Sequence, residues 1–286
     1  MCLKNLQNTI IKVLAIAVIS FGVPIYLANN FLWSEPLFNV CVIALFYLFT
    51  LPTLNKKQWL SIIILCNLMI LMRHAGLFIL VGLFVARFLF LENRSVWRKY
   101  LFLLLLCSLG SVIWFVFAPS SGADWTKTII SVNLFQKIAH NFQMLSHGFS
   151  SWFLPMAIPL TLRVIGAVLI LAILALWVKK NSSLNRADYI WLLASLIYVG
   201  CLHGVYEMPV EDGERYFSPL YPMLFIVFFR IFDRMLSSLE TTKKKYAIIV
   251  VLYCWSIYPM YRTFSNAYFW HSLRCQEKVH GSNGIG

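Results

Sequence analysis

Long runs of apolar residues, separated by short polar segments, dominate the chain from end to end. A transmembrane helix needs about 20 predominantly apolar residues. Runs of this kind occupy 9–28, 36–53, 100–118, 156–178, 188–204, 216–235 and 246–263. Each is expected to form a helix that crosses a bilayer, because an α-helix satisfies its backbone hydrogen bonds internally in lipid.

The segment 59–92 is also apolar, but Arg73 and His74 interrupt it. As a single helix it would be about 50 Å long, whereas the hydrocarbon core of a bilayer is about 30 Å thick. We therefore expect two short spans joined at Arg73 and His74. The whole pattern predicts an all-α, polytopic membrane protein with about nine transmembrane helices, including this short helical hairpin.

Basic residues support this count, because they fall on one side of the membrane when the nine spans are taken in order. The clusters are Lys4 with Lys12, Lys56-Lys57, Arg94 with Arg98-Lys99, Lys179-Lys180 with Arg186, and Lys243 to Lys245. Short cytoplasmic loops collect Lys and Arg, so we expect a cytoplasmic N-terminus and an extracytoplasmic C-terminus. The short loops favour a bacterial inner membrane, and an endoplasmic reticulum membrane is the alternative.

Composition agrees with a membrane protein. The 286 residues are 60% hydrophobic and 12% charged, which leaves too little polar surface for a soluble domain. The formal net charge is +13. Since the basic clusters are short and separate, they fit attraction to anionic lipid headgroups, and no nucleic-acid partner is expected. We expect one transmembrane helical domain over 1–263 and a polar C-terminal tail over 264–286.

The longest predicted outer loop, 119–154, has the pattern of an amphipathic helix. Its apolar positions recur every three or four residues: Ile130, Leu134, Ile138, Phe142, Leu145 and Phe149. Such a helix lies in the membrane interface and would cover the short spans, either as a structural roof or as a guide for a lipid-borne substrate. His140 and His147 are two turns apart, about 10 Å, so we expect no metal site there.

Most acidic residues fall on the predicted outer side, in short loops. They are Glu35, Asp124, Glu207, Glu211, Asp212, Glu214 and Glu277. The same side carries the Arg73-His74 tip of the hairpin and Glu214-Arg215. A solvated helix end explains any single one of these residues, because ionisable groups at span ends reach water at little cost. Their convergence on one face makes that face the candidate functional surface.

Three segments on this face carry a family resemblance. They are Leu32 to Phe38 (LWSEPLF), Met72 to Leu77 (MRHAGL) and Glu214 to Pro222 (ERYFSPLYP). In this order, with the amphipathic loop between the second and third, the chain from about 29 to 235 resembles multi-span glycosyltransferases of the GT-C superfamily, of the mannosyltransferase-like kind. The resemblance implies inverting transfer from a polyprenyl- or dolichyl-phosphate sugar to a glycan, lipid or protein acceptor, on the extracytoplasmic face.

The matched residues have chemistry that suits this reaction. A leaving lipid phosphate develops negative charge, and a guanidinium binds phosphate through a fork of N–H donors, so Arg73 and Arg215 are the candidate phosphate ligands. His74 is a candidate additional donor, or else a polar helix-end residue. Tyr216 is a candidate for stacking on the sugar, although tyrosines at this depth also serve as interfacial anchors.

Inverting transfer also needs a carboxylate that accepts the proton of the acceptor hydroxyl or holds a divalent metal ion. Glu35 and Glu214 are the matched acids, and the sequence requires no other cofactor. Ser34-Glu35-Pro36 also reads as an ordinary helix start, with Ser as the cap and the acid in the first turn. A purely structural role for Glu35 therefore stays open.

The chain differs from the family at its beginning. Family members generally have a large first outer loop with acidic residues, whereas here only 28–35 separates the first two predicted spans. The chain is thus expected to be a family member that lacks the first span and its loop. Two alternatives follow: a non-catalytic or truncated binder of lipid phosphate, and a transporter or flippase of lipid-linked glycans. A transporter would place charges deep within its spans, where this sequence has few.

Overall fold

The computed structural model describes residues 6–22, 25, 35–51, 53–73, 75–90, 97–117, 134–181, 184–205 and 216–281, and their regular structure is helical with no strand. The helices in chain order are α1 (Thr9–Ser20), α3 (Glu35–Phe49), α4 (Lys56–Met72), α5 (Ala75–Leu89), α6 (Trp97–Cys107), α7 (Leu109–Phe117), α9 (Leu134–Ser151), α10 (Leu160–Asn181), α11 (Arg186–Val205), α13 (Tyr221–Ser238) and α14 (Thr242–Gly281). The predicted all-α class is confirmed for this part of the chain.

Within the described ranges, three helices are long and apolar enough to span a membrane. They are Leu160–Lys180, Arg186–Gly204 and Thr242–Ser265. The apolar helices Thr9–Ser20, Pro36–Phe49 and Ala75–Leu89 are shorter. The chain is therefore a helical protein suited to membrane association, while the expected count of nine spans is not established by helix length.

Several helix boundaries differ from the expected ones; α1, for example, ends at Ser20, whereas the expected span ran to 28. The expected break in 59–92 is confirmed, because α4 ends at Met72 and Arg73 has extended backbone angles (φ −153°, ψ 130°) before α5 begins. The single helix expected over 100–118 is wrong, since α6 and α7 meet at a turn at Ser108. Helix α14 continues to Gly281, so the expected start of the tail at 264 is not a helix end.

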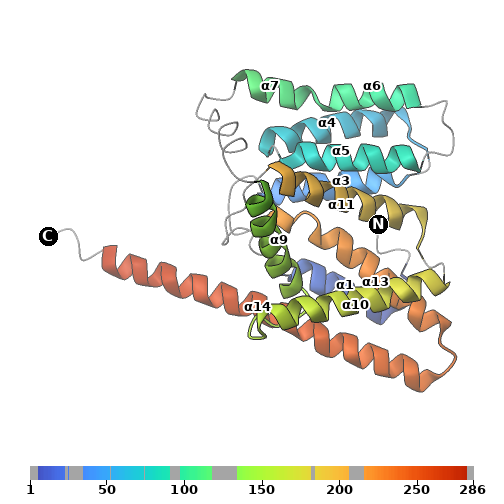
Figure 1. Cartoon of the computed structure of the whole chain (residues 1–286), viewed down its shortest axis with the longest axis vertical. Coiled ribbons are helices and arrows are strands. Elements are labelled where there is room, and N and C mark those ends of the chain that lie inside the picture. Colours follow the sequence, from blue (N-terminus) through green and yellow to red (C-terminus); the bar gives the residue numbers. More distant parts are fainter. Residues whose placement is uncertain are drawn as a thin grey trace.

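Most helices lie side by side along a common direction, as Figure 1 shows. Every described basic cluster lies at the same end of this arrangement, on the right of Figure 1: Lys56-Lys57, Arg98-Lys99, Lys179-Lys180 and Lys243 to Lys245. We call this the basic end. The opposite end carries the α4–α5 turn at Arg73, and we call it the Arg73 end.

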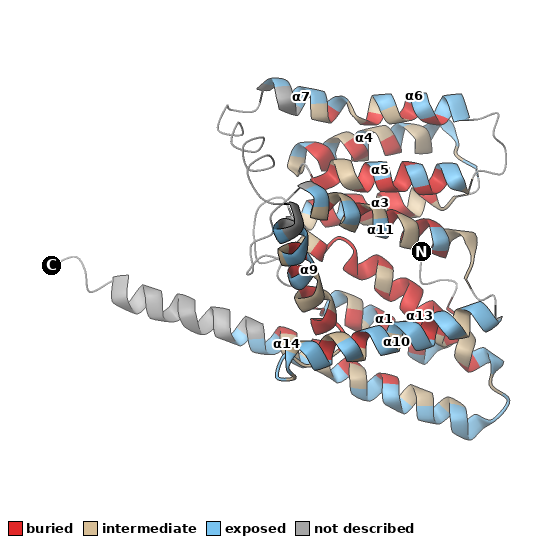
Figure 2. Cartoon of the chain, in the orientation of Figure 1, coloured by how far each residue is buried: buried red, intermediate tan, exposed pale blue. Residues whose placement is uncertain are grey.

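The closest helix contact joins α5 and α11. A Cβ added to Gly82 would lie 2.6 Å from the backbone oxygen of Ala194, so only glycine lets the two backbones approach this far. Helix α13 is buried along most of its length, whereas α10 and α14 have long exposed apolar faces (Figure 2). The exposed faces are where lipid would contact the chain.

Helix α9 lies across the direction of its neighbours at the Arg73 end (Figure 1). Asn141 is fully buried, and its amide donates to the backbone oxygen of His203 in α11 at 3.1 Å. Ile138 and Phe142, from the apolar stripe of the sequence, are exposed instead. The predicted helix within 119–154 thus exists, and it attaches to the protein through a polar contact and presents apolar side chains outward.

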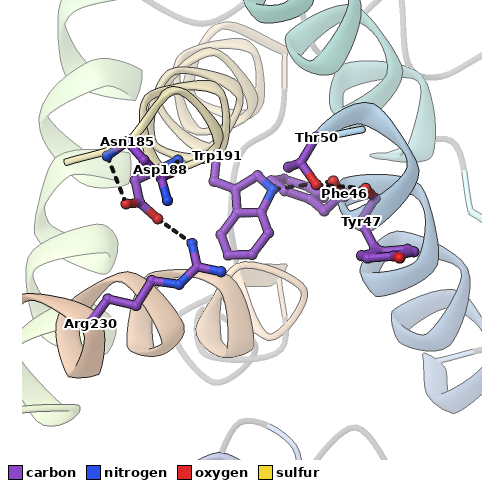
Figure 3. Close-up of polar contacts among 7 residues, drawn as sticks. All are labelled: Phe46, Tyr47, Thr50, Asn185, Asp188, Trp191 and Arg230. Atoms are coloured by element: carbon purple, nitrogen blue, oxygen red, sulfur yellow. Dashed lines mark hydrogen bonds and ion pairs between the residues drawn. The ribbon is translucent and has the colours of Figure 1, made fainter. Parts of the chain in front are cut away.

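A buried ion pair links α11 and α13 towards the basic end. The Arg230 guanidinium donates to the Asp188 carboxylate, and it also stacks on Trp191 with its carbon 4.8 Å from the ring centre (Figure 3). The indole N–H of Trp191 donates to the backbone oxygen of Phe46 in α3 at 3.2 Å. Three helices are therefore joined by one chain of polar contacts.

Asp233, one turn after Arg230, binds the start of a different helix, α1. Its carboxylate accepts hydrogen bonds from the backbone N–H groups of Gln7 (2.7 Å) and Asn8 (2.9 Å), which immediately precede α1. A carboxylate at a helix N-terminus satisfies free N–H groups and complements the helix dipole. Arg230 and Asp233, three residues apart on α13, therefore each bind a different helix.

Arg87 completes the polar contacts at the basic end. It is buried in α5 and donates to the backbone oxygens of Phe49 (3.2 Å) and Leu51 (2.8 Å), at the end of α3, and to the hydroxyl of Tyr100 (3.3 Å). A cation beside the last carbonyls of a helix is favourable, because this end of the helix dipole is negative.

Removal of the negative charge at Asp188 should destabilise the protein strongly. Asp188→Asn keeps the size of the side chain but leaves Arg230 as a buried cation without its counter-ion, which costs about 3–5 kcal/mol. We expect a clear fall in the melting temperature in detergent micelles, largely recovered in the double variant Asp188→Asn/Arg230→Met. Glu240→Gln, at an exposed acid, is the control and should have no effect. An unchanged melting temperature for Asp188→Asn would refute the structural role of the pair.

Substitution of Gly82 should separate α5 from α11. Gly82→Ala places a methyl group against the backbone of Ala194, and overpacking of this kind costs about 1–3 kcal/mol. Gly200→Ala is the matched control, because nothing lies within 4 Å of a Cβ at that position. We expect a lower melting temperature for Gly82→Ala and an equal or higher one for Gly200→Ala. Equal effects of the two variants would contradict the close contact.

Candidate functional site

Arg73 lies in the tight turn between α4 and α5. Its backbone N–H donates to the oxygen of Met69 at 3.0 Å, and its oxygen accepts from the N–H of Gly76 at 2.9 Å. A Cβ on Gly76 would lie 2.9 Å from the Met69 side chain and 3.0 Å from its backbone oxygen, so glycine permits the sharp reversal. Arg73 therefore lies where α4 ends, at the tip of the α4–α5 hairpin.

The Arg73 guanidinium lies against two aromatic rings from distant parts of the sequence. Its carbon is 5.8 Å from the ring centre of Phe38 and 5.6 Å from that of Tyr216. Cation–π contacts of this kind stabilise by about 0.5–2 kcal/mol, depending on desolvation. They also restrict the position of the guanidinium, whose N–H donors lie in its own plane.

Two further contacts fix the aromatic partners. Phe38 is buried in the first turn of α3. The backbone oxygen of Tyr216 accepts a hydrogen bond of 2.8 Å from the hydroxyl of Tyr198, a buried residue of α11. The turn after Tyr216 is anchored by Tyr221, whose hydroxyl donates to the oxygen of Val18 in α1 at 3.1 Å.

The structure thus brings together one described residue from each segment that carries the family resemblance: Phe38, Arg73 and Tyr216. Sequence reasoning assigned roles to Arg73 and Tyr216 but none to Phe38, which lies in the quoted LWSEPLF segment. It also missed Tyr198, whose hydrogen bond to Tyr216 crosses between helices and leaves no local pattern.

The other predicted site residues are outside the described part of the structure. These are His74, Glu214 and Arg215, as well as the side chain of Glu35, whose backbone begins α3. Among described residues, no group of three or more His, Cys, Asp or Glu side chains is arranged to hold a metal ion. The described site is therefore an oriented guanidinium with aromatic walls, which is chemistry for binding an anion beside an apolar or sugar group.

No protein-family model matches this sequence, and neither a curated protein nor a solved structure matches it.

Proposed function

We propose that the protein is an inverting glycosyltransferase of the GT-C kind, which transfers a sugar from a polyprenyl-phosphate donor to a glycan, lipid or protein acceptor. The observation that carries this proposal is the position of Arg73 between Phe38 and Tyr216. Three segments that resemble the family in sequence, and that are far apart along the chain, supply one residue each to this contact.

The proposed reaction uses these residues at the anomeric carbon of the donor. An acceptor hydroxyl attacks that carbon, the bond to the phosphate oxygen breaks, and the configuration inverts. Arg73, with Arg215 and His74, stabilises the negative charge that develops on the departing polyprenyl phosphate. Glu35 or Glu214 accepts the proton of the attacking hydroxyl, directly or beside a divalent metal ion. Tyr216 presents its ring to the sugar.

The proposed membrane arrangement has nine spans, a cytoplasmic N-terminus and an extracytoplasmic Arg73 end, in a bacterial inner membrane. The described basic clusters support it, because all of them lie at the end opposite Arg73. A lipid-linked donor would then approach Arg73 from the outer leaflet. Helix α9, with Ile138 and Phe142 exposed, would lie in the interface at the same end.

The positions of the buried charges argue against the alternative of a transporter. Arg87, Asp188 and Asp233 bind helix ends or a neighbouring side chain near the basic end, where they serve a structural purpose. A transport pathway would instead need ionisable residues along a route through the bundle. A non-catalytic binder of lipid phosphate stays as the second candidate, because the contacts at Arg73 support binding of the donor more directly than its chemistry.

Loss of the Arg73 guanidinium should weaken donor binding strongly. We would label membranes with a photoreactive polyprenyl-phosphate sugar and measure both labelling and transferred sugar. Arg73→Ala is expected to lower labelling about tenfold or more, because a charge-assisted hydrogen bond is lost. The matched control is Arg98→Ala, since Arg98 also stacks on an aromatic ring, that of Trp97 at 5.9 Å, but at the basic end.

The outcomes separate the candidates. Labelling that depends on Arg73 together with transfer supports the transferase, whereas Arg73-dependent labelling without transfer indicates the non-catalytic binder. Equal labelling of Arg73→Ala and the unaltered chain, in folded protein, would overturn the proposal.

A further inference from the structure

An apolar groove lies between α10, α11 and α13, beside the end of α9. It consists of two cavities of about 410 and 330 Å³ that share the residues Phe149, Leu171, Leu192 and Leu224. Along α10 it extends from Val164 to Lys179, which corresponds to about 22 Å at the helical rise per residue. The adjacent surface of α10 is exposed and apolar, so lipid in the bilayer has direct access to the groove.

Arg163 immediately precedes Val164, the first residue of α10 that lines this groove, and it is the unusual residue of α10. Only 3% of it is exposed, and its Nε and Nη1 atoms have no hydrogen-bond partner among the described residues. It shares the buried face of α10 with Ala167 and Leu174, which line the two cavities. A buried guanidinium without an anion is costly, so this position calls for a negatively charged ligand.

Trp152 adds a second donor. It lines the same groove, is 3% exposed, and its indole N–H has no hydrogen-bond partner within the described structure. An indole N–H only donates, so it needs an oxygen acceptor, and the carbonyl of an ester is a suitable one. The groove therefore offers one neutral donor and a long apolar channel, and the buried Arg163 lies one turn before Ala167 on the same face of α10.

This groove is separate from the contact at Arg73. Tyr216 faces Arg73, whereas Phe217 and Leu220 line the groove, so the turn over 216–220 lies between the two. A ligand with its charge at Arg163 is therefore distinct from a donor with its phosphate at Arg73.

We propose that the groove binds an anionic phospholipid of the bilayer. Its phosphate is bound by Arg163, an ester carbonyl accepts from the N–H of Trp152, and an acyl chain fills the groove. The negative phosphodiester matches the single guanidinium, and the ester matches the neutral donor. An isoprenoid chain is a pure hydrocarbon and would leave the Trp152 N–H unsatisfied, which is why a phospholipid fits better than polyprenyl phosphate. The inference does not depend on the proposed glycosyl transfer.

The test is the effect of added lipid on the melting temperature of the delipidated full chain in detergent micelles. Phosphatidylglycerol should raise the melting temperature, because a ligand that binds the folded state stabilises it, and phosphatidylcholine and polyprenyl phosphate should raise it much less. Arg163→Gln should lose most of the shift with phosphatidylglycerol, and Trp152→Phe, which keeps the ring, should lose part of it. The control Arg98→Gln, at an exposed arginine, should keep the full shift.

The lipid-free melting temperatures give a second readout. Arg163→Gln should be at least as stable as the unaltered chain without lipid, since it removes an uncompensated buried charge. Ala167→Phe, which fills the groove and retains Arg163, should also lose the shift, and it replaces Arg163→Gln if that variant does not fold. A full phosphatidylglycerol shift in these variants, or a larger shift with polyprenyl phosphate, would overturn the proposal.

Discussion

The ion pair between Asp188 and Arg230 is the contact on which the arrangement of the helices depends most. A charge buried among apolar helices is costly without a partner, so the pair fixes α11 against α13, and Trp191 extends the contact to α3. Asp233 and Arg87 apply the same rule to helix ends, where a carboxylate meets the start of α1 and a guanidinium meets the end of α3. The pairing of buried charges towards the basic end therefore determines how these helices pack together.

The candidate site lies at the opposite end and follows from those neighbours. Gly82 brings α5 against α11, and this contact places the hairpin turn near Tyr198 and the segment that Tyr198 holds. Arg73 then meets Phe38 and Tyr216 without any polar contact of the basic end being involved. The candidate site and the buried polar contacts thus lie at opposite ends of the helices. Residues at the Arg73 end can therefore vary without loss of the contacts that hold the helices together.

Local features of the structure could be predicted from the sequence, and long-range pairings could not. The break at Arg73 was predictable because 59–92 is too long for one span and carries two polar residues at its middle. The partner of Arg230 was not, since Asp233 is the visible acid at helical spacing whereas Asp188 is 42 residues away. The turn at Ser108 could not be predicted either. Asn67 of α4 donates to the backbone oxygen of Leu106 and accepts from the N–H of Gly110 at this turn. A contact with another helix leaves no trace in the hydrophobic pattern of 100–118. In the site, charge and motif order pointed to Arg73 and Tyr216, while Phe38 and Tyr198 act through packing and a single hydroxyl.

The side of the membrane on which Arg73 lies is the most direct test of this account. In a chain whose seven native cysteines are replaced, Arg73→Cys and Lys57→Cys would be treated in intact cells with a membrane-impermeant thiol reagent. We expect labelling at position 73 from outside and labelling at position 57 only after the membrane is permeabilised. Labelling of position 57 from outside, with position 73 protected, would contradict an extracytoplasmic site and the transfer reaction proposed for it.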